Sequence, residues 1–287
     1  MILIADSGST KTDWCYLAPD GQHTLLQSEG INPYFQESDN IAEIVRKGVY
    51  EKADTSALTH IYFYGAGCSS DEKCNIVRNG LQQVYPHATI EVEHDMMAAA
   101  RALCNNSKGI VCILGTGSNS VLFDGEKITE DVPSLGFILG DEGSGAYLGK
   151  KLIRRFLYGE LPQTLHNSFI NESGVTKEQI LDAVYKKPLP NRYLATFSKF
   201  IHTHIENEVM YQLVYDAFNA FIQHHISKYS NYHSTPLHCT GSVGYTYKDI
   251  LLEVCRNNHI QTGNIVKSPL NGLITYHEQQ WKRKNNP

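Results

Sequence analysis

Two segments of the chain, about a hundred residues apart, repeat one pattern of hydrophobic and polar positions. Residues 2–26 read ILIADSGSTKTDWCYLAPDGQHTLL, and residues 110–130 read IVCILGTGSNSVLFDGEKITE. Each has an apolar run, a turn of glycine and hydroxyl residues, a second apolar run, an Asp-Gly pair and a third run. Asp-Gly between strand-like segments is a strong hairpin signal. We therefore predict the same three-stranded unit twice, and with it an internal duplication and two lobes.

Helix-like and strand-like segments alternate after the first unit, which gives a βββαβα pattern. We predict helices over 37–51, 71–84 and 95–104, and strands over 60–66 and 89–94. Asp71 is the expected N-cap of the second of these helices.

The second half begins with the repeated hairpin and continues with long helical stretches. We predict helices over 144–157 and about 176–230, with a local break at 186–191, then a strand at 237–240, a helix near 247–257, a strand near 264–267 and a last helix at 271–282.

Composition narrows the class of protein. The chain has 287 residues, of which 41% are hydrophobic and 19% charged, as in ordinary globular proteins. A net charge of −5 lacks the basic footprint of a nucleic-acid binder, and no apolar run approaches the ~18 residues of a membrane span. The seven cysteines include no CxxC pair. Met1 leads directly into a strand-like segment with no basic region, so we expect no secretory signal. We expect reduced thiols and a cytoplasmic protein that binds neither nucleic acid nor membrane.

The first glycine turn carries residues suited to phosphate. It lacks the GxGxxG spacing of a dinucleotide fold and the GxxxxGK[ST] of a P-loop, and it leads into a strand rather than a helix. Its backbone amides and hydroxyls can still form a nest for phosphate. Asp6, at the strand end, could hold Mg²⁺ through water, since Mg²⁺ keeps several waters. The candidate phosphate ligands here are Gly8, Ser9, Thr10 and Lys11, and a plain hairpin turn stays an alternative.

Two further glycine turns support a nucleotide site. Residues 115–120, GTGSNS, repeat the first turn, so the two loops could hold one polyphosphate from both sides of a cleft. The candidates there are Gly115, Thr116, Gly117 and Asn119. Residues 239–244, CTGSVG, form a strand-to-helix turn in which Gly241 and Ser242 could approach a nucleotide.

Three acids are candidates for work on a sugar. Asp95 begins a helix directly after a strand, so it is either an N-cap or a general base at the ligand-binding end of a sheet. Asp141 and Glu142 stand among five glycines in GFILGDEGSGAYLG. Such a run costs backbone entropy, which indicates that something approaches this backbone closely.

The order of these motifs resembles the N-acetylglucosamine kinase branch of the BadF/BadG/BcrA/BcrD ATPase family, within the sugar kinase, Hsp70 and actin superfamily. The motifs that carry the resemblance are DSGSTKTD, HDMMAAARAL, LGTGSNS, LGFILGDEGSGAYLG and CTGSVG, and they cover nearly the whole chain.

The resemblance implies a two-lobed α/β fold of duplicated ribonuclease-H-like, actin-like ATPase type, with ATP and sugar in the cleft between lobes. The lobes would be residues 1–115 and 116–269, with a helical insertion at about 144–230 and a final helix, 270–287, packed back on the first lobe. A homodimer is also implied.

The resemblance also implies roles for single residues. Asp6 would lie near Mg²⁺ and the phosphates, Asp95 would be the catalytic base, and Gly241 and Ser242 would lie near the adenosine. The residues matching the sugar site are Asn32, Asp95, Ser118, Asp141 and Glu142.

The expected reaction is in-line phosphoryl transfer from MgATP to an amino sugar, foremost to N-acetylglucosamine at its 6-hydroxyl. N-acetylmuramic acid and glucosamine stay open as substrates. Two other classes also stay open: an ATPase activator of an iron–sulfur dehydratase or reductase, using Cys68 and Cys74, and a sugar-sensing regulator. The paired histidines, such as His224 and His225, are expected to pack or to lie at the surface.

Overall fold

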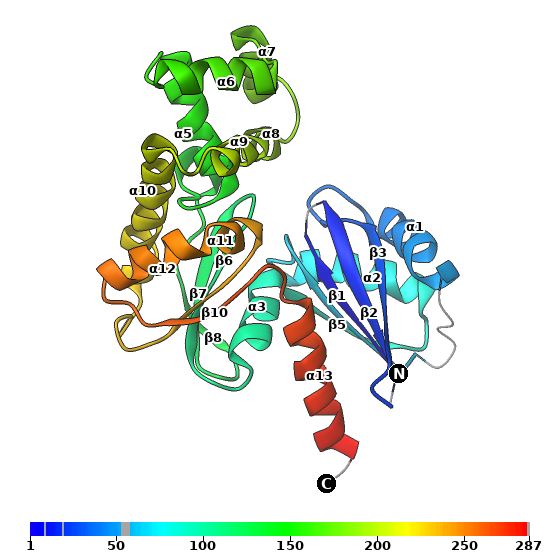
Figure 1. The fold of residues 1–287 in the computed structure, drawn as a ribbon. Helices are drawn as coiled ribbons and strands as arrows, with labels where there is room; N and C mark the ends of the chain where they lie inside the picture. The colour runs from blue at the N-terminus through cyan, green and yellow to red at the C-terminus, as the bar shows by residue number, and fades with distance from the viewer. Residues whose placement is uncertain (9, 19, 53–57, 286–287) are drawn as a thin grey trace. The chain divides into compact units, whose positions relative to one another are not determined.

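The computed structural model describes residues 1–8, 10–18, 20–52 and 58–285, and it divides into two compact units (Figure 1). The first unit is residues 1–106 with 269–287, and the second is residues 107–268. The expected division at 115 would have left strand β6 (Gly109–Leu114) in the first lobe. It belongs to the sheet of the second unit, because it pairs there with strands on both sides.

The first unit has a five-stranded sheet in the order β3-β2-β1-β4-β5. β1, β2 and β3 are antiparallel, whereas β1, β4 and β5 run parallel, so the helices between them cross over the sheet. Its elements are β1 (Ile2–Ser7), β2 (Lys11–Leu17), β3 (His23–Glu29), α1 (Ser38–Gly48), η1 (Tyr50–Lys52), β4 (His60–Gly65), α2 (Asp71–Val84), β5 (Thr89–His94), α3 (Asp95–Cys104) and α13 (Leu270–Asn285).

Helices bury both faces of this sheet, which explains the continuous apolar run of β1. Leu3 and Ala5 pack into one cluster with α1 and α2, while Ile2 and Ile4 pack into another with α3 and α13. Successive side chains of a strand point to opposite faces, so a strand covered on both sides must be apolar throughout. The C-terminal helix α13 thus completes the core of the first unit.

The second unit repeats the first. Its sheet has the order β10-β9-β6-β7-β8, in which β6, β7 and β8 form the antiparallel hairpins and β6, β9 and β10 run parallel. Its other strands are β7 (Ser118–Phe123), β8 (Ile128–Asp131), β9 (Leu237–Thr240) and β10 (Thr262–Val266). The predicted duplication and the two-lobed α/β fold are confirmed.

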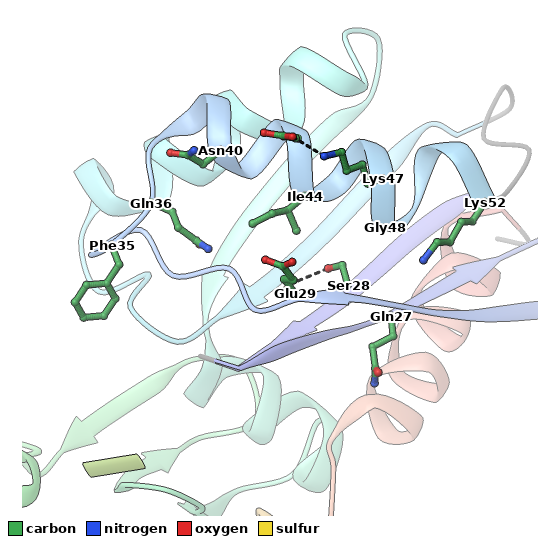
Figure 2. A pocket seen from close by; sticks show the side chains of 11 residues that line it. Gln27, Ser28, Glu29, Phe35, Gln36, Asn40, Ile44, Lys47, Gly48 and Lys52 are labelled. Carbon is green, nitrogen blue, oxygen red and sulfur yellow. Dashed lines mark hydrogen bonds and ion pairs between the residues drawn. The ribbon is translucent and has the colours of Figure 1, made fainter. Parts of the chain in front are cut away.

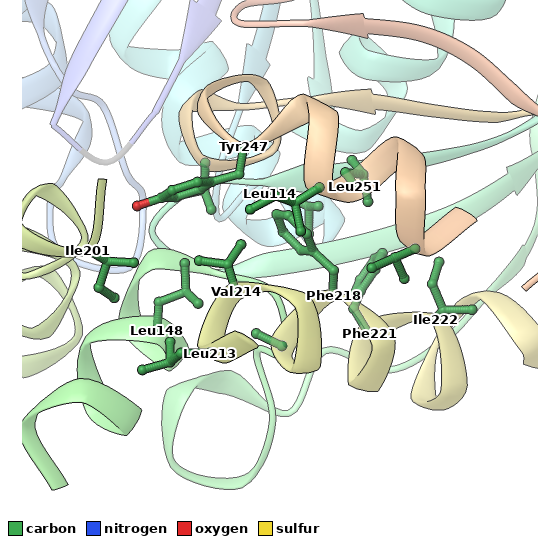
Figure 3. Close-up of a cluster of buried hydrophobic side chains, with 14 of the residues drawn as sticks. Leu114, Leu148, Ile201, Leu213, Val214, Phe218, Phe221, Ile222, Tyr247 and Leu251 are labelled. Carbon is green, nitrogen blue, oxygen red and sulfur yellow. The ribbon is translucent and has the colours of Figure 1, made fainter. Parts of the chain in front are cut away.

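Helices between β8 and β9 make up the insertion of the second unit. They are α4 (Gly136–Leu139), α5 (Gly145–Leu157), α6 (Gln163–Ser173), α7 (Lys177–Tyr185), α8 (Pro190–Thr196), α9 (Ser198–Thr203) and α10 (Glu208–His224), followed by η2 (Ile226–Lys228). After β9 come α11 (Ser242–Thr246) and α12 (Lys248–Asn257). Figure 3 shows how α10 packs Val214, Phe218 and Phe221 against Leu114 of β6 and Leu251 of α12.

Three sequence expectations about local structure were wrong. Residues 163–173 form a helix that we did not predict. The helical stretch expected over about 176–230, with one break at 186–191, is four helices, and the predicted break falls between α7 and α8. The break before α8 is sharp because Leu189 is left-handed, with φ 57°, and Pro190 begins the new helix. The N-cap of α2 is Ser70, whose side chain accepts the N–H of Lys73, and not Asp71. Among the described residues, no helix has the length and apolar character to cross a bilayer.

Candidate functional site

The first glycine turn closes between β1 and β2. The N–H of Gly8 donates to the carbonyl of Lys11 at 3.0 Å, and the Lys11 ammonium is bound to both oxygens of Asp13. Asp13 lies opposite Asp6 in the β1–β2 register. The turn therefore combines two carboxylates and a lysine, of which the sequence indicated Asp6 and Lys11 and missed Asp13. The expected ligand Ser9 lies outside the described residues.

Buried hydroxyls join this turn to the segment that carries Asn32. Ser7 Oγ lies 2.7 Å from Thr12 Oγ1, donates to the carbonyl of Ile31 and accepts its N–H. Ser7 and Thr12 are almost fully buried, so both hydroxyls need partners within the protein. Residue type and spacing do not single out these two hydroxyls, because their role depends on the register between β1 and β2.

Asn32 is held by hydrogen bonds to the residues that follow it, and a glycine of the loop after β4 packs against its side chain. Its Oδ1 accepts the N–H of Tyr34 at 2.9 Å, and its N–H donates to Gln36. Gly67 has φ +86°, and a Cβ there would lie 2.6 Å from the Asn32 Oδ1. Only glycine fits at this position, which brings the loop after β4 against Asn32.

Asp95 begins α3 at the carboxyl end of β5. The β1–β4–β5 registers put Ser7, Gly65 and His94 in one row across the parallel strands. Asp95 comes one residue after this row at the end of β5. Asp6 comes one residue before it on β1, which is separated from β5 by β4. The carboxyl ends of parallel strands are where open α/β sheets bind their ligands. The N-cap of α3 is His94, whose Nδ1 accepts the N–H of Met96 at 3.2 Å, so Asp95 is not the N-cap.

The second glycine turn lies at the start of α5, within the second unit. The N–H groups of Gly145 and Ala146, in the first turn of the helix, donate to the carbonyls of Gly115 and Thr116. Gly115 has nothing within 4 Å of the place where a Cβ would stand. This turn is thus fixed by backbone hydrogen bonds and has open space at its first glycine.

Asp141 is buried against this turn. Its Oδ1 accepts the N–H of Ser118 at 3.3 Å, and a Cβ on Gly117 would lie 3.1 Å from its Oδ2. Burial raises the pKa of the Asp141 carboxyl, and the bond from Ser118 and the charge of Lys150 only partly offset it. The hydroxyl of Ser118 is buried and has no hydrogen-bond partner within the described chain. A carboxylate and an unpaired hydroxyl here can serve vicinal sugar hydroxyls.

Glu142 faces the interior beside a histidine. Its Oε2 lies 3.6 Å from Nε2 of His225, which stacks on Phe221. Burial lowers the pKa of His225, which favours the neutral imidazole. Lys150 on α5 donates to the carbonyl of Phe137, and burial lowers its pKa. His225 joins this segment from 83 positions away, so sequence spacing gave no signal for it.

Gly241 lies against the end of β6. It has φ +117°, and a Cβ there would lie 2.4 Å from the Leu114 carbonyl oxygen. The turn before α11 therefore packs directly beside the turn that follows Leu114. Ser242 is the first residue of α11 and is exposed.

Some expected residues are less well placed. Thr116 is exposed, and Asn119 directs its Oδ1 to the N–H of Ser120. Because side chains alternate along β7, Asn119 lies on the opposite face of the sheet from Ser118.

A groove of about 670 Å³ lies beside α1 in the first unit (Figure 2). It contains none of the residues singled out from the sequence. Gln36 lines it and also bonds to Asn32 and to the carbonyl of Gly30, so the groove borders the Asn32 segment. Its other lining residues are Gln27, Ser28, Glu29, Phe35, Asn40, Glu43, Ile44, Lys47, Gly48 and Lys52.

The described residues include no group of three or more His, Cys, Asp or Glu side chains arranged to hold a metal ion. Asp6 and Asp13 offer carboxylate oxygens on adjacent strands. Such a sparse oxygen set suits Mg²⁺, which binds through one or two carboxylates, waters and substrate phosphates.

Comparison with known proteins agrees with this arrangement. Residues 5–231 match the model of the BadF/BadG/BcrA/BcrD ATPase family, and the chain belongs to that family. The "Putative N-acetylglucosamine Kinase" of Porphyromonas gingivalis is 44% identical, with 98% of this chain and all of that chain covered, at a TM-score of 0.94.

Two further relatives are more distant. The glucosamine kinase of Vibrio cholerae is 29% identical over 122 residues, which are 42% of this chain and 40% of that protein, so the match spans less than half of it. A glucokinase of the ROK family from Streptomyces griseus, solved with glucose and AMPPNP, is 14% identical over 97% of this chain and 98% of its own, with a TM-score of 0.55, and shares the fold.

Proposed function

We propose that this protein is an ATP-dependent kinase of amino sugars that transfers the γ-phosphoryl group of ATP to a sugar hydroxyl. The observation that carries the proposal is the row of strand ends in the first unit, where Asp6, the Lys11 turn and Asp95 lie at the carboxyl ends of the parallel strands β1 and β5. Phosphoryl transfer needs a phosphate cradle and a base for the attacking hydroxyl, which the Lys11 turn and Asp95 would supply.

The two glycine turns would bind the phosphates of ATP, with Gly241 and Ser242 near the adenosine. Asp6 would hold Mg²⁺ through water, and the ion would neutralise charge on the phosphates when bound. Lys11 is bound to Asp13 in the structure and would turn toward phosphate, since an ammonium prefers a multiply charged anion to one carboxylate.

Asp95 would accept the proton of the sugar hydroxyl as it attacks the γ-phosphate in line. Asp141 and Asn32 would hold other hydroxyls, and Ser118 and Glu142 would lie beside them. We favour N-acetylglucosamine, phosphorylated at its 6-hydroxyl, because the 44% identical relative carries that substrate in its name. Glucosamine and N-acetylmuramic acid are the competing substrates.

An iron–sulfur activator has less support. Cys68 is almost fully buried in the core of the first unit, and the Cys74 thiol points to its carbonyl at 3.6 Å. Burial raises the pKa of both thiols, whereas a cluster is held by thiolates.

The substrate and the hydroxyl can be identified from the product. The protein would be incubated with MgATP and each sugar in turn, and the product examined by mass spectrometry and phosphorus NMR. A monophosphate whose phosphorus couples to the two C6 protons supports the 6-hydroxyl. A phosphorus coupled to the anomeric proton, or no sugar phosphate with any amino sugar, would reject the proposal in that form.

A further inference from the structure

We propose that His94 is a positioning residue for Asp95. Its Nδ1 would hold one carboxylate oxygen, leave the other for the sugar hydroxyl, and set through its charge how strong a base Asp95 is. The inference rests on the proposed function, because it assigns a partner to the base of that reaction.

The contact between the two side chains is close and selective. His94 Nδ1 lies 2.8 Å from Oδ1 of Asp95. That oxygen is buried and meets no other hydrogen-bonding group within the described chain, although 27% of the Asp95 side chain is exposed. A buried carboxylate oxygen without a donor is costly. Since Oδ1 is buried, Oδ2 is the oxygen left to accept a proton from a substrate.

One nitrogen serves two partners here. Nδ1 can accept the Met96 N–H only through its lone pair, and it can donate to Asp95 only when it carries a proton. Donation to a carboxylate is about twice as strong as a neutral hydrogen bond. The protonated imidazole therefore favours Asp95, while the neutral imidazole with its proton on Nε2 favours the helix cap.

Charges around His94 affect the pH at which it changes between these two partners. Burial lowers the pKa of His94, but the hydrogen bond and charge of Asp95 and the charge of Glu93 outweigh it, so the net pKa is raised. Opposite His94, β4 contributes Gly65, which carries no charge. After β4, the Cys68 thiol interacts with Asp95 and stays protonated, because burial raises its pKa to about 12. Helix α2, which packs on β5, carries Cys74, whose pKa burial also raises.

The charge of His94 sets the direction in which pH changes catalysis. A protonated His94 stabilises the Asp95 carboxylate and so weakens it as a base. As the pH rises through the raised pKa of His94, the charge is lost and Asp95 becomes a stronger base. The acid limb of kcat/KM for the sugar would thus report His94 rather than Asp95.

Two substitutions separate positioning from charge. His94→Asn keeps a good N-cap and an amide near the position of Nδ1, but it cannot titrate. His94→Ala removes donor, cap and charge. His87→Asn, at an exposed site in the same unit, is the matched control. The measurements are kcat and both KM values between pH 5 and 9, together with NMR titration of the His94 imidazole in the wild type and in Asp95→Asn.

We expect His94→Asn to keep kcat within a few-fold at pH 8 and to move the acid limb to lower pH. His94→Ala would lose kcat by at least about tenfold, as expected for a mispositioned base, with KM for ATP unchanged. The pKa of His94 would fall in Asp95→Asn. The inference would be overturned if the acid limb of the pH profile does not move in His94→Asn. It would also be overturned if the pKa of His94 is the same in the wild type and in Asp95→Asn. Full activity of Asp95→Asn would instead overturn the proposed function, and the NMR titration would still test the pair.

Discussion

Asp141 accepts the backbone N–H of Ser118 at 3.3 Å, which fixes the segment before α5 to the turn after β6. Asp141 is also left-handed, with φ 61°, a conformation that aspartate and asparagine tolerate better than most residues. Its buried carboxyl has a raised pKa. This combination of buried charge and uncommon backbone is typical of a residue kept for function at a cost in stability.

Asp141→Asn should therefore stabilise the folded protein while impairing its activity on the sugar. A carboxyl whose folded-state pKa is raised costs stability as the pH passes from its unfolded value to the folded one, and at neutral pH that cost is fully present. Asparagine removes the charge and can keep the bond from Ser118. We expect a higher Tm at pH 7, a smaller difference at pH 4, and a higher KM for the sugar with lower kcat. A change confined to the KM for ATP would contradict the assignment of Asp141.

Gly115→Ala tests whether a ligand approaches the second glycine turn. The structure leaves open space for the new Cβ, and the backbone needs no left-handed conformation. Stability should hold or rise by about 0.4–1 kcal/mol, since alanine restricts the unfolded chain. The KM for ATP should rise several-fold, because phosphate would contact this backbone. A stable variant with an unchanged KM would show that ATP does not bind at this turn.

Gly149→Ala tests packing in the helical insertion. Alanine usually stabilises a helix by about 1 kcal/mol relative to glycine. At this position the Cβ would stand 1.9 Å from the carbonyl oxygen of Leu194 on α8, so helices α5 and α8 must separate. We expect a loss of roughly 2–4 kcal/mol by urea unfolding. Arg154→Ala, exposed on the same helix, is the control and should change stability little.

Arg101→Ala tests how α13 is held in the first unit. Arg101 donates to the Tyr64 hydroxyl at 2.7 Å, and that hydroxyl lies 2.9 Å from Nε2 of His277 on α13. Losing the arginine leaves buried polar groups poorly paired, which costs about 1–3 kcal/mol. Hydrogen exchange along α13 should accelerate. Arg46→Ala, exposed on α1, serves as the comparison, and equal effects of the two substitutions would show that the buried network is unimportant.

Local signals predicted much of the fold. The two Asp-Gly turns could be predicted because each residue has a local role. The side chains of Asp20 and Asp124 accept the backbone N–H two residues further along the chain, and glycines 21 and 125 have positive φ. Helix α6 was missed because its buried side chains, Leu165 and Phe169, are only two among polar neighbours. That helix is stabilised by the core into which these two side chains pack, and its local sequence alone does not show those contacts.

Some residues of the candidate site could likewise be predicted from local sequence, whereas others are revealed only by the fold. Asp6, Asp95 and Asp141 stand next to glycines or strand ends, so residue type and spacing single them out. Asp13 needs the cross-strand register to be seen beside Asp6, and His225 reaches Glu142 only through the fold of α10. His94 adjoins Asp95 in the sequence, but its importance comes from the direction of a single nitrogen.

The central claim is tested most directly by ADP release from MgATP with N-acetylglucosamine, N-acetylmuramic acid, glucosamine, N-acetylmannosamine or glucose, in the wild type and in Asp95→Asn. We expect ADP release that depends on an amino sugar in the wild type and falls by at least about a hundredfold in the variant, as for loss of a general base, while ATP still binds. ADP release that ignores every sugar, or that survives in Asp95→Asn, would contradict the account.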